Sequence, residues 1–228
     1  NHSSAASDVY KRQVLSEMEA EGIKIDTSYL KKLDKEFEDD LEKLKKEIFK
    51  KCGEEFNLNS PKQLGEILFD KLKLVSKPKK TKTGQYSTSE EVLSSLANDH
   101  RIIENILEWR SLDKLQNTYV KSLPNEVSNL TNRVHSSFNQ TVTTTGRLSS
   151  NNPNLQNIPI RTDNGQKIRK AFIPRNDDYI IMAADYSQIE LRVIASISNE
   201  ENMIDAFVNN QDIHTITASK IYLSLIHI

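Results

Sequence analysis

The stretch Tyr179-Ile180-Ile181-Met182-Ala183-Ala184-Asp185-Tyr186-Ser187-Gln188-Ile189-Glu190-Leu191-Arg192 decides how the rest of the chain is interpreted. Its opening apolar run is bounded by polar residues and is short enough for a buried strand rather than a helix. Ser187 and Glu190 have the spacing of a capping box, and apolar residues then recur every four positions through Ile197. The pattern predicts a strand, an acidic residue, a turn and a helix.

Asp185 stands where the predicted strand ends. A carboxylate there is well placed to bind a divalent cation, because the strand fixes its position and hard cations prefer oxygen ligands. The alternative is that Asp185 only helps to cap the following helix. On this stretch alone both interpretations stay open.

The composition excludes several classes of protein. Of the 228 residues 36% are hydrophobic and 28% charged, and no apolar run approaches the length of a membrane span, so we expect no membrane partner. The N-terminus lacks the layout of a secretion signal. A single cysteine, Cys52, excludes an internal disulfide and a cysteine-rich zinc site, and it fits a reducing compartment such as the cytoplasm.

Charge is distributed unevenly along the chain, although the net charge is only -1. Between residues 131 and 175 the charged residues are basic apart from Asp163, whereas between 176 and 212 they are acidic apart from Arg192. A basic block followed by an acidic one suits a surface that binds a polyanion beside a pocket that binds a cation. Ordinary drift of surface charge is the alternative.

Two amphipathic helices are predicted in the first half of the chain. Apolar residues recur every three or four positions over 30–48, which indicates a helix with a narrow apolar seam that stops near Gly53. The segment 92–107, entered through a capping box at Thr88 and Glu91, is a candidate to pack antiparallel against it. Together they would form a projecting helical arm.

The segment between these helices is basic and rich in small polar residues. Ser60-Pro61-Lys62-Gln63 predicts a helix start with a serine cap, a proline in the first turn and a reciprocal glutamine. Lysines then crowd residues 71–82, before Ser87-Thr88-Ser89. This combination suits binding to a phosphate backbone without reading sequence; a merely solvated loop is the alternative.

Strands and a long loop are predicted after Pro124. Residues 133–142 have the β-branched and aromatic content of a strand, and residues 171–174 predict another. Residues 144–161 are predicted to form a polar loop rich in Asn and Gln, whose amides can bind base edges or sugars without adding charge.

Taken together, these motifs resemble the family A DNA polymerases, the bacterial DNA polymerase I type. The stretch 185–192 resembles the family's first carboxylate motif, and residues 145–147 its Thr-Gly-Arg motif. Residues 152–161 resemble its Asn-Pro-Asn-Leu-Gln-Asn-Ile-Pro-x-Arg motif, and residues 56–60 match its thumb. The resemblance runs from about Val14 to about Tyr222.

The resemblance implies an α+β fold of the right-hand polymerase type. A palm entry segment would occupy 14–28, a long helical thumb hairpin 29–121, and a partial palm with an antiparallel β-sheet 122–222. Residues 1–13 and 223–228 match nothing in the family, and we expect tails that are artefactual or disordered.

The resemblance also implies roles for individual residues. Asp185 would be the catalytic carboxylate and a ligand of two Mg²⁺ ions about 4 Å apart, with the backbone carbonyl of Tyr186 as a further ligand. Glu190 would lie beside the incoming sugar and reject a 2′-hydroxyl. The nucleotide-binding residues would be Ser187, Gln188, Ile189, Glu190 and His214. The DNA-binding residues would be Arg147, Asn154, Gln156, Asn157, Arg161, Lys114, Asn57, Asn59, Ser60, Ser87 and Thr88.

The implied activity is template-directed DNA synthesis in replication and repair, by a monomeric bacterial enzyme of the cytoplasm and nucleoid that uses primer–template DNA and deoxynucleoside triphosphates. We find no match to the family's fingers helix or to its second carboxylate motif, His-Asp-Glu, so we expect a fragment that is inactive alone. A non-catalytic nucleic-acid-binding module is the alternative. A single-subunit RNA polymerase would share the architecture, but Glu190 within an intact Ser-Gln-Ile-Glu argues against it.

Overall fold

Helix α2 (Thr27–Cys52) begins and ends where the local chemistry dictates. The structure, a computed structural model, describes residues 2–222. The carboxylate of Asp26 caps the helix by accepting a 2.8 Å hydrogen bond from the backbone N–H of Tyr29. Gly53 ends it in the left-handed conformation, with φ of 75°, and donates to the carbonyl of Phe49. The predicted helix and its stop are therefore confirmed.

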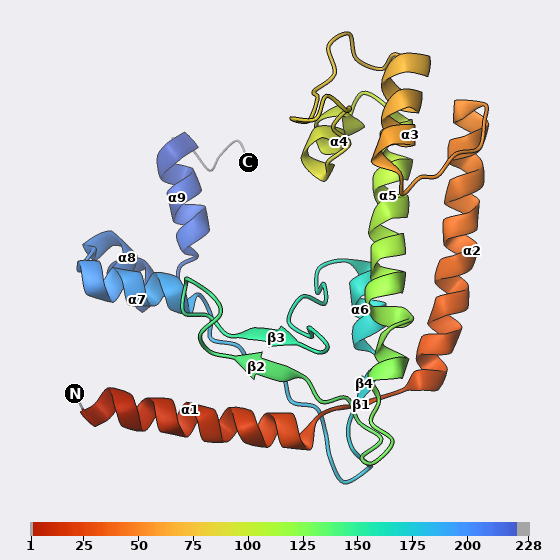
Figure 1. Cartoon of the computed structure of the whole chain (residues 1–228). Helices are drawn as coiled ribbons and strands as arrows, with labels where there is room; N and C mark the ends of the chain where they lie inside the picture. Colours follow the sequence, from red (N-terminus) through yellow and green to blue (C-terminus); the bar gives the residue numbers. More distant parts are fainter. Residues whose placement is uncertain (1, 223–228) are drawn as a thin grey trace. The chain divides into compact units, whose positions relative to one another are not determined.

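Helix α5 (Arg101–Leu115) packs antiparallel against α2 (Figure 1). Two polar side chains fix the register of the pair. The amide of Asn105 donates to Glu47 at 3.0 Å, and the amide of Gln116 donates to the carboxylate of Asp34 at 2.8 Å. The predicted antiparallel pairing is confirmed. The apolar residues that bury this seam include Leu30, Leu33, Phe37, Ile48, Ile103 and Ile106.

The second helix of the arm is interrupted, contrary to the prediction. Helix α4 (Glu90–Ala97) ends before Asn98-Asp99, two weak helix formers, and α5 begins after His100. The expected capping box at Thr88 and Glu91 is wrong. Ser89, not Thr88, is the N-cap of α4, and it makes no side-chain capping bond. Thr88 is buried instead, with its hydroxyl beside Arg110.

The start of α3 (Pro61–Gly65) follows the prediction with one correction. Ser60 is the N-cap, its hydroxyl accepts from the backbone N–H of Gln63 at 3.4 Å, and Pro61 occupies the first turn. The side chain of Gln63 does not reach back to Ser60; it accepts a 2.7 Å bond from the N–H of Asn57. Gln63 therefore orders the loop that precedes the N-cap.

Two small antiparallel sheets are formed by segments that lie before and after the helical arm in the sequence. Strands β1 (Lys24–Ile25) and β4 (Phe172–Ile173) pair, and β2 (Ser137–Asn139) pairs with β3 (Ser149–Asn151). The strands predicted at 133–142 and 171–174 are thus present but shorter than expected. The expected loop 144–161 is interrupted by β3, whose serines and asparagine carry no strand signal.

The first helix includes the segment that we expected to be an N-terminal tail. Helix α1 spans His2–Glu21, so residues 2–13, expected to lie outside the fold, continue it. Glu19 ties α1 to the sheet region: its carboxylate accepts from the N–H of Phe138 at 2.6 Å. The expected tail at 223–228 lies outside the described residues. The other short helices up to residue 180 are η1 (Glu66–Lys71), η2 (Gln116–Val120), η3 (Leu123–Glu126) and α6 (Asp163–Arg169).

The chain forms two units, one up to Ile180 and one from Ile181 on. In the second unit, α7 (Ile189–Ser198), α8 (Glu201–Val208) and α9 (Ile213–Tyr222) enclose a small core around Ala195, Ala206, Phe207 and Ile213. The helix predicted after Ser187 is confirmed as α7.

The strand predicted at 179–184 is wrong. These residues are irregular and exposed, with Ile180 88% and Met182 83% accessible. A strand needs a partner for its backbone N–H and C=O groups, and no described segment pairs with this one. Among the helices described for residues 2–222, none combines the length and apolar character that crossing a membrane requires.

Candidate nucleic-acid interface and nucleotide site

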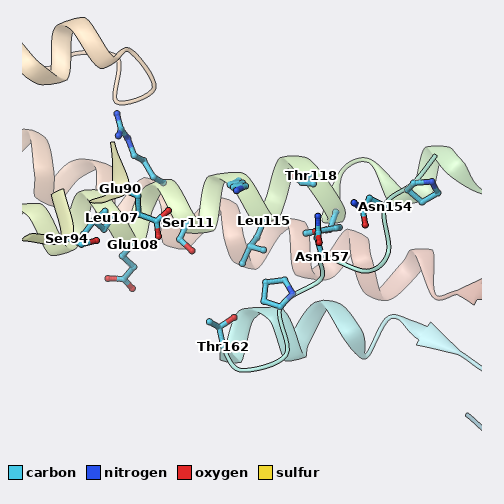
Figure 2. Close-up of a pocket in the computed structure, with 15 residues that line it drawn as sticks. Glu90, Ser94, Leu107, Glu108, Ser111, Leu115, Thr118, Asn154, Asn157 and Thr162 are labelled. Carbon is cyan, nitrogen blue, oxygen red and sulfur yellow. The ribbon is translucent and has the colours of Figure 1, made fainter. Parts of the chain in front are cut away.

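A cleft of about 990 Å³ lies between the helical arm and the loop that follows β3. Lys114 lines it from α5. Asn154 and Asn157 line it from the loop (Figure 2). These three residues, predicted to contact DNA from motifs about forty positions apart, thus lie in one cleft. Figure 2 shows the loop facing the helix that carries Leu115 and Thr118.

Buried hydroxyl groups fix the start of this loop. The hydroxyl of Ser136, 5% exposed, lies 2.6 Å from that of Ser150 and 2.7 Å from the carbonyl of Pro153. Ser150 in turn accepts a 3.2 Å bond from the N–H of Leu155. Because all these groups are satisfied at short range, the backbone that presents Asn154 is held firmly.

Side chains of helix α6 hold the other end of the loop by its backbone carbonyls. Arg169 donates to the carbonyls of Ile158 at 2.8 Å and Pro159 at 3.1 Å, and Gln166 donates to that of Ile160 at 3.2 Å. Gly165 allows the approach, because a Cβ there would lie 2.5 Å from the carbonyl oxygen of Pro159. The loop is therefore clamped by its carbonyls, and the side chains of Gln156, Asn157 and Arg161 are exposed.

The other predicted DNA-binding residues lie in three loops of the first unit. Arg147 is exposed in the turn between β2 and β3, where its carbonyl accepts from the hydroxyl of Thr143 at 2.5 Å. Asn57 and Asn59 are exposed before α3, and the amide of Asn59 donates to Asp113 at 3.3 Å. Ser60 is half-buried as the cap of α3, Ser87 is half-buried, and Thr88 is buried.

Much of the basic block at 131–175 stabilises the fold rather than standing free on the surface. Arg133 and Arg175 both pair with Glu21, and Lys167 pairs with Glu36. The last of these pairs raises the pKa of Lys167 through its hydrogen bond with Glu36. Arg169 is also engaged, by the carbonyls of the loop. The number of basic residues in the sequence therefore overstated how many positive charges are available to bind a polyanion.

In the second unit, Asp185 and Tyr186 lie in the exposed segment that precedes α7. Two Mg²⁺ ions need at least two carboxylates that reach both ions. Among the described residues, no group of three or more His, Cys, Asp or Glu side chains is close enough to hold a metal ion. Asp185 therefore belongs to no such cluster among the described residues, and it lies in an exposed segment.

The turn after Asp185 is held by Arg192 and not by the expected capping box. Gln188, in the left-handed conformation, is the N-cap of α7, and no side-chain capping bond forms. Arg192 donates to the carbonyl of Ser187 at 3.0 Å, and its guanidinium lies 4.5 Å from the ring centroid of Phe207. Arg192 thus holds the turn through a carbonyl and packs against a ring of α8.

Asp212 connects two residues that were predicted to bind the nucleotide. Its carboxylate accepts from the amide of Gln188 at 3.3 Å and from the N–H of His214 at 3.2 Å. It also accepts from the hydroxyl of Thr215 at 2.7 Å, and this bond, aided by that from His214, lowers the pKa of Asp212. Gln188 and His214 are thus brought together through an acid that the sequence interpretation left without a role.

Comparison with known proteins identifies this arrangement. The family model "DNA polymerase family A" matches residues 27–226. The chain belongs to DNA polymerase family A. It is 53% identical over 209 residues to DNA polymerase I of Geobacillus stearothermophilus and 52% identical to that of Bacillus subtilis. These matches cover 92% of this chain but only 24% of either relative, so the chain spans about a quarter of their length.

A solved member of the family has the same fold. The structure described as the POL domain of Pol1 from M. smegmatis in complex with DNA primer-template and dNTP matches with a TM-score of 0.81 and 43% identity. The match covers 91% of this chain and 36% of that one. The α+β class with small antiparallel sheets is therefore shared with a polymerase domain.

Sequence interpretation missed several residues that position these family A motifs. Asp212 and Thr162, the N-cap of α6, carried a signal, because each is a good capping residue three positions before a helical N–H donor. Ser136, Arg169 and Arg110 carried none: a serine in a strand-like segment and arginines on a helix reveal no partner until the chain is folded.

Proposed function

We propose that this chain is the part of a family A DNA polymerase that holds primer–template DNA, and that the complete enzyme performs template-directed DNA synthesis. The observation that carries the proposal is the meeting of Lys114, Asn154 and Asn157 in one cleft. A lysine suits a phosphate, and amides both donate and accept, so the set can hold nucleic acid without selecting its sequence. The M. smegmatis relative, described as a complex with primer-template DNA and dNTP, supports it.

The helical arm formed by α2 and α5 with α3 and α4 at its tip would be the thumb, over residues 29–121. Residues 122–222 would form part of the palm, entered through 14–28. The antiparallel helix pair, and the two sheets formed by segments outside it, support this division. The fingers and the last palm motif would belong to other parts of the enzyme.

Asp185 would be the catalytic carboxylate of the complete enzyme and a ligand of Mg²⁺, with the carbonyl of Tyr186 as a neighbour. Ser187, Gln188, Ile189 and His214 would line the nucleotide site, and Glu190 would face the sugar. Two contacts support this: Arg192 fixes the carbonyl of Ser187, and Asp212 joins Gln188 to the start of α9. A second acidic ligand would have to come from elsewhere in the enzyme.

The partners of the complete enzyme would be primer–template DNA and deoxynucleoside triphosphates, and the enzyme would act as a monomer in replication and repair. Its place would be the bacterial cytoplasm, at the nucleoid, because the substrate is there. The bacterial origin of the curated relatives supports this assignment.

The test uses the 228-residue chain with a fluorescent primer–template duplex. Anisotropy should report weak binding whose affinity falls steeply with salt, because each neutralised phosphate adds about -0.9 to the slope of log affinity against log salt. Lys114→Met should reduce that slope by about 0.9, since one phosphate contact is lost. Lys43→Met is the matched control, because Lys43 is exposed on α2, outside the cleft. Salt-insensitive binding, or equal effects of the two substitutions, would overturn the proposed grip.

A non-catalytic binding module is the second candidate, and the exposed position of Asp185, outside any cluster of three or more metal-binding side chains among the described residues, favours it. The two candidates differ in a chimaera in which residues 27–222 replace the matching segment of the G. stearothermophilus polymerase. Primer extension by the chimaera with Mg²⁺ and four deoxynucleotides supports the polymerase, whereas DNA binding without extension supports the module. The isolated chain should extend no primer in either case.

A further inference from the structure

Arg110 reaches from α5 to two separate loops at the tip of the helical arm. Its Nη1 donates to the carbonyl of Thr88 at 2.7 Å, and its Nη2 donates to the carbonyl of Leu58 at 3.4 Å. The hydroxyl of Thr88 lies 3.5 Å from the same Nη2. One guanidinium therefore joins the loop before α3 to the loop before α4.

The two loops are built alike around this contact. In each, the central residue is buried and offers its carbonyl to Arg110: Leu58 is 3% exposed and Thr88 is 6% exposed. The flanking residues face outward, because Asn57, Asn59 and Ser89 are exposed. The centre of each loop is anchored, and its small polar neighbours are presented.

Arg110 lines the same cleft as Lys114, but its guanidinium is engaged by the carbonyls of Thr88 and Leu58, which suits anchoring better than direct contact with a ligand. It is half-buried, and burial lowers the pKa of its guanidinium from the ordinary value, although an arginine stays charged at neutral pH. Its planar fork can serve two carbonyls at once, which a lysine ammonium on a flexible stem does not reproduce. A second link from the same helix, from Asn59 to Asp113, also holds the first loop to α5.

We infer that Arg110 is a positioning residue for DNA, holding loops 57–60 and 87–89 in the arrangement in which their small polar side chains contact the phosphate backbone. The inference rests on the proposed function, since it assumes that these loops meet DNA. It adds a residue that binds no DNA itself and acts on two loops from one point.

The salt dependence of binding separates positioning from direct contact. The side chains that the loops present are neutral. Loss of their contacts with DNA therefore does not change the number of counterions that binding releases. Arg110→Met should therefore lower the affinity of the 228-residue chain for a primer–template duplex by roughly tenfold, the scale of one or two neutral hydrogen bonds, and leave the salt slope unchanged. Arg110→Lys should not rescue the affinity. A direct phosphate contact predicts the opposite on both counts: a slope smaller by about 0.9 in Arg110→Met, and rescue by lysine.

Amide hydrogen exchange, without DNA, gives an independent readout. Exchange in loops 57–60 and 87–89 should rise at least roughly tenfold in both Arg110 variants and stay unchanged in α2, because only the local anchor is lost. Lys114→Met is the matched control on the same helix, and it should lower the salt slope without changing exchange in either loop. Unchanged exchange in the Arg110 variants overturns the inference.

The remaining outcomes are also decisive. If the wild-type chain binds no duplex, the proposed function fails and the DNA role of Arg110 fails with it, whereas binding by wild type and by Arg110→Met with equal affinity overturns the inference alone. If Arg110→Met does not fold, as judged by circular dichroism, Arg110→Lys and the wild-type chain decide. DNA must then protect both loops of the wild-type chain from exchange, and protection of neither loop overturns the inference.

Discussion

The cleft in the first unit and the stretch around Asp185 in the second unit differ in how far the chain completes them. Lys114, Asn154 and Asn157 line the same cleft, because α5, buried serines and α6 hold both sides in place. Asp185 stands in an exposed segment and belongs to no cluster of three or more metal-binding side chains among the described residues. The residues of the proposed nucleic-acid grip are therefore brought together within one unit, whereas Asp185 is not placed in a comparable cluster.

The largest expected effect tests this division in the chimaeric polymerase. Asp185→Asn should lower the single-turnover rate of nucleotide addition by roughly a thousandfold or more, because a metal ion that stabilises several kcal/mol of transition-state charge loses an anionic ligand. Binding of the primer–template duplex should be retained. An unchanged rate would remove Asp185 from the site and leave the second unit without a known role.

The next effect concerns the stability of the grip. Phe37 is fully buried in the core of the first unit, so Phe37→Ala should lower the free energy of unfolding by about 3–5 kcal/mol. Ile180→Ala, at a site 88% exposed in the stretch before Asp185, should change it by less than about 0.5 kcal/mol. Urea denaturation followed by fluorescence of Trp109, the single tryptophan, measures both. Equal losses of unfolding free energy in the two variants would mean that Phe37 and Ile180 are equally buried in solution.

A smaller change is expected in substrate selection. In the chimaera, Glu190→Ala should raise the ratio of kcat/KM for ribonucleotides over deoxyribonucleotides by roughly tenfold, because a carboxylate that rejects the 2′-hydroxyl is removed. Glu200→Ala, another exposed acid of the same unit, serves as the control. If both variants keep the ratio of the parent chimaera, Glu190 has no part in sugar selection.

The smallest effect is electrostatic and local to the second unit. The lowered pKa of Asp212 means that its bonds to Thr215 and His214 stabilise the start of α9 above the ordinary aspartate pKa of about 3.9, and that this support is lost as the pH falls through the lower, folded-state pKa. Carboxyl-carbon NMR should therefore give Asp212 an apparent pKa below 3.9. Thr215→Val should raise it, whereas Thr217→Val should not, since the hydroxyl of Thr217 donates to Ile213.

Sequence alone predicted the elements whose causes are local. Gly53 marks the end of α2, and Ser60 with Pro61 marks the start of α3, because caps act within one turn. The antiparallel partner of α2 could also be found, since an apolar seam requires a second one. The composition of the motifs was sufficient to suggest family A before any fold was known.

The features that the sequence missed depend on partners distant along the chain. The apolar residues from Tyr179 to Met182 predicted a buried strand, but a strand forms only beside another strand. Thr88 had the spacing of a capping box, yet Arg110 takes its carbonyl and buries its hydroxyl. Likewise, the cations of the basic block looked available until Glu21 and Glu36 were found beside them.

The way α6 holds the loop after β3 has a consequence for how this interface can change over time. Arg169 and Gln166 grip main-chain oxygens, which every amino acid possesses, so the clamp places little demand on the identity of Gln156 or Asn157. Mutational freedom is therefore concentrated at the side chains that would face nucleic acid, while Gly165 and Arg169 are fixed by geometry. Substitutions at these two amides should therefore change the proposed contacts with nucleic acid without unfolding the protein.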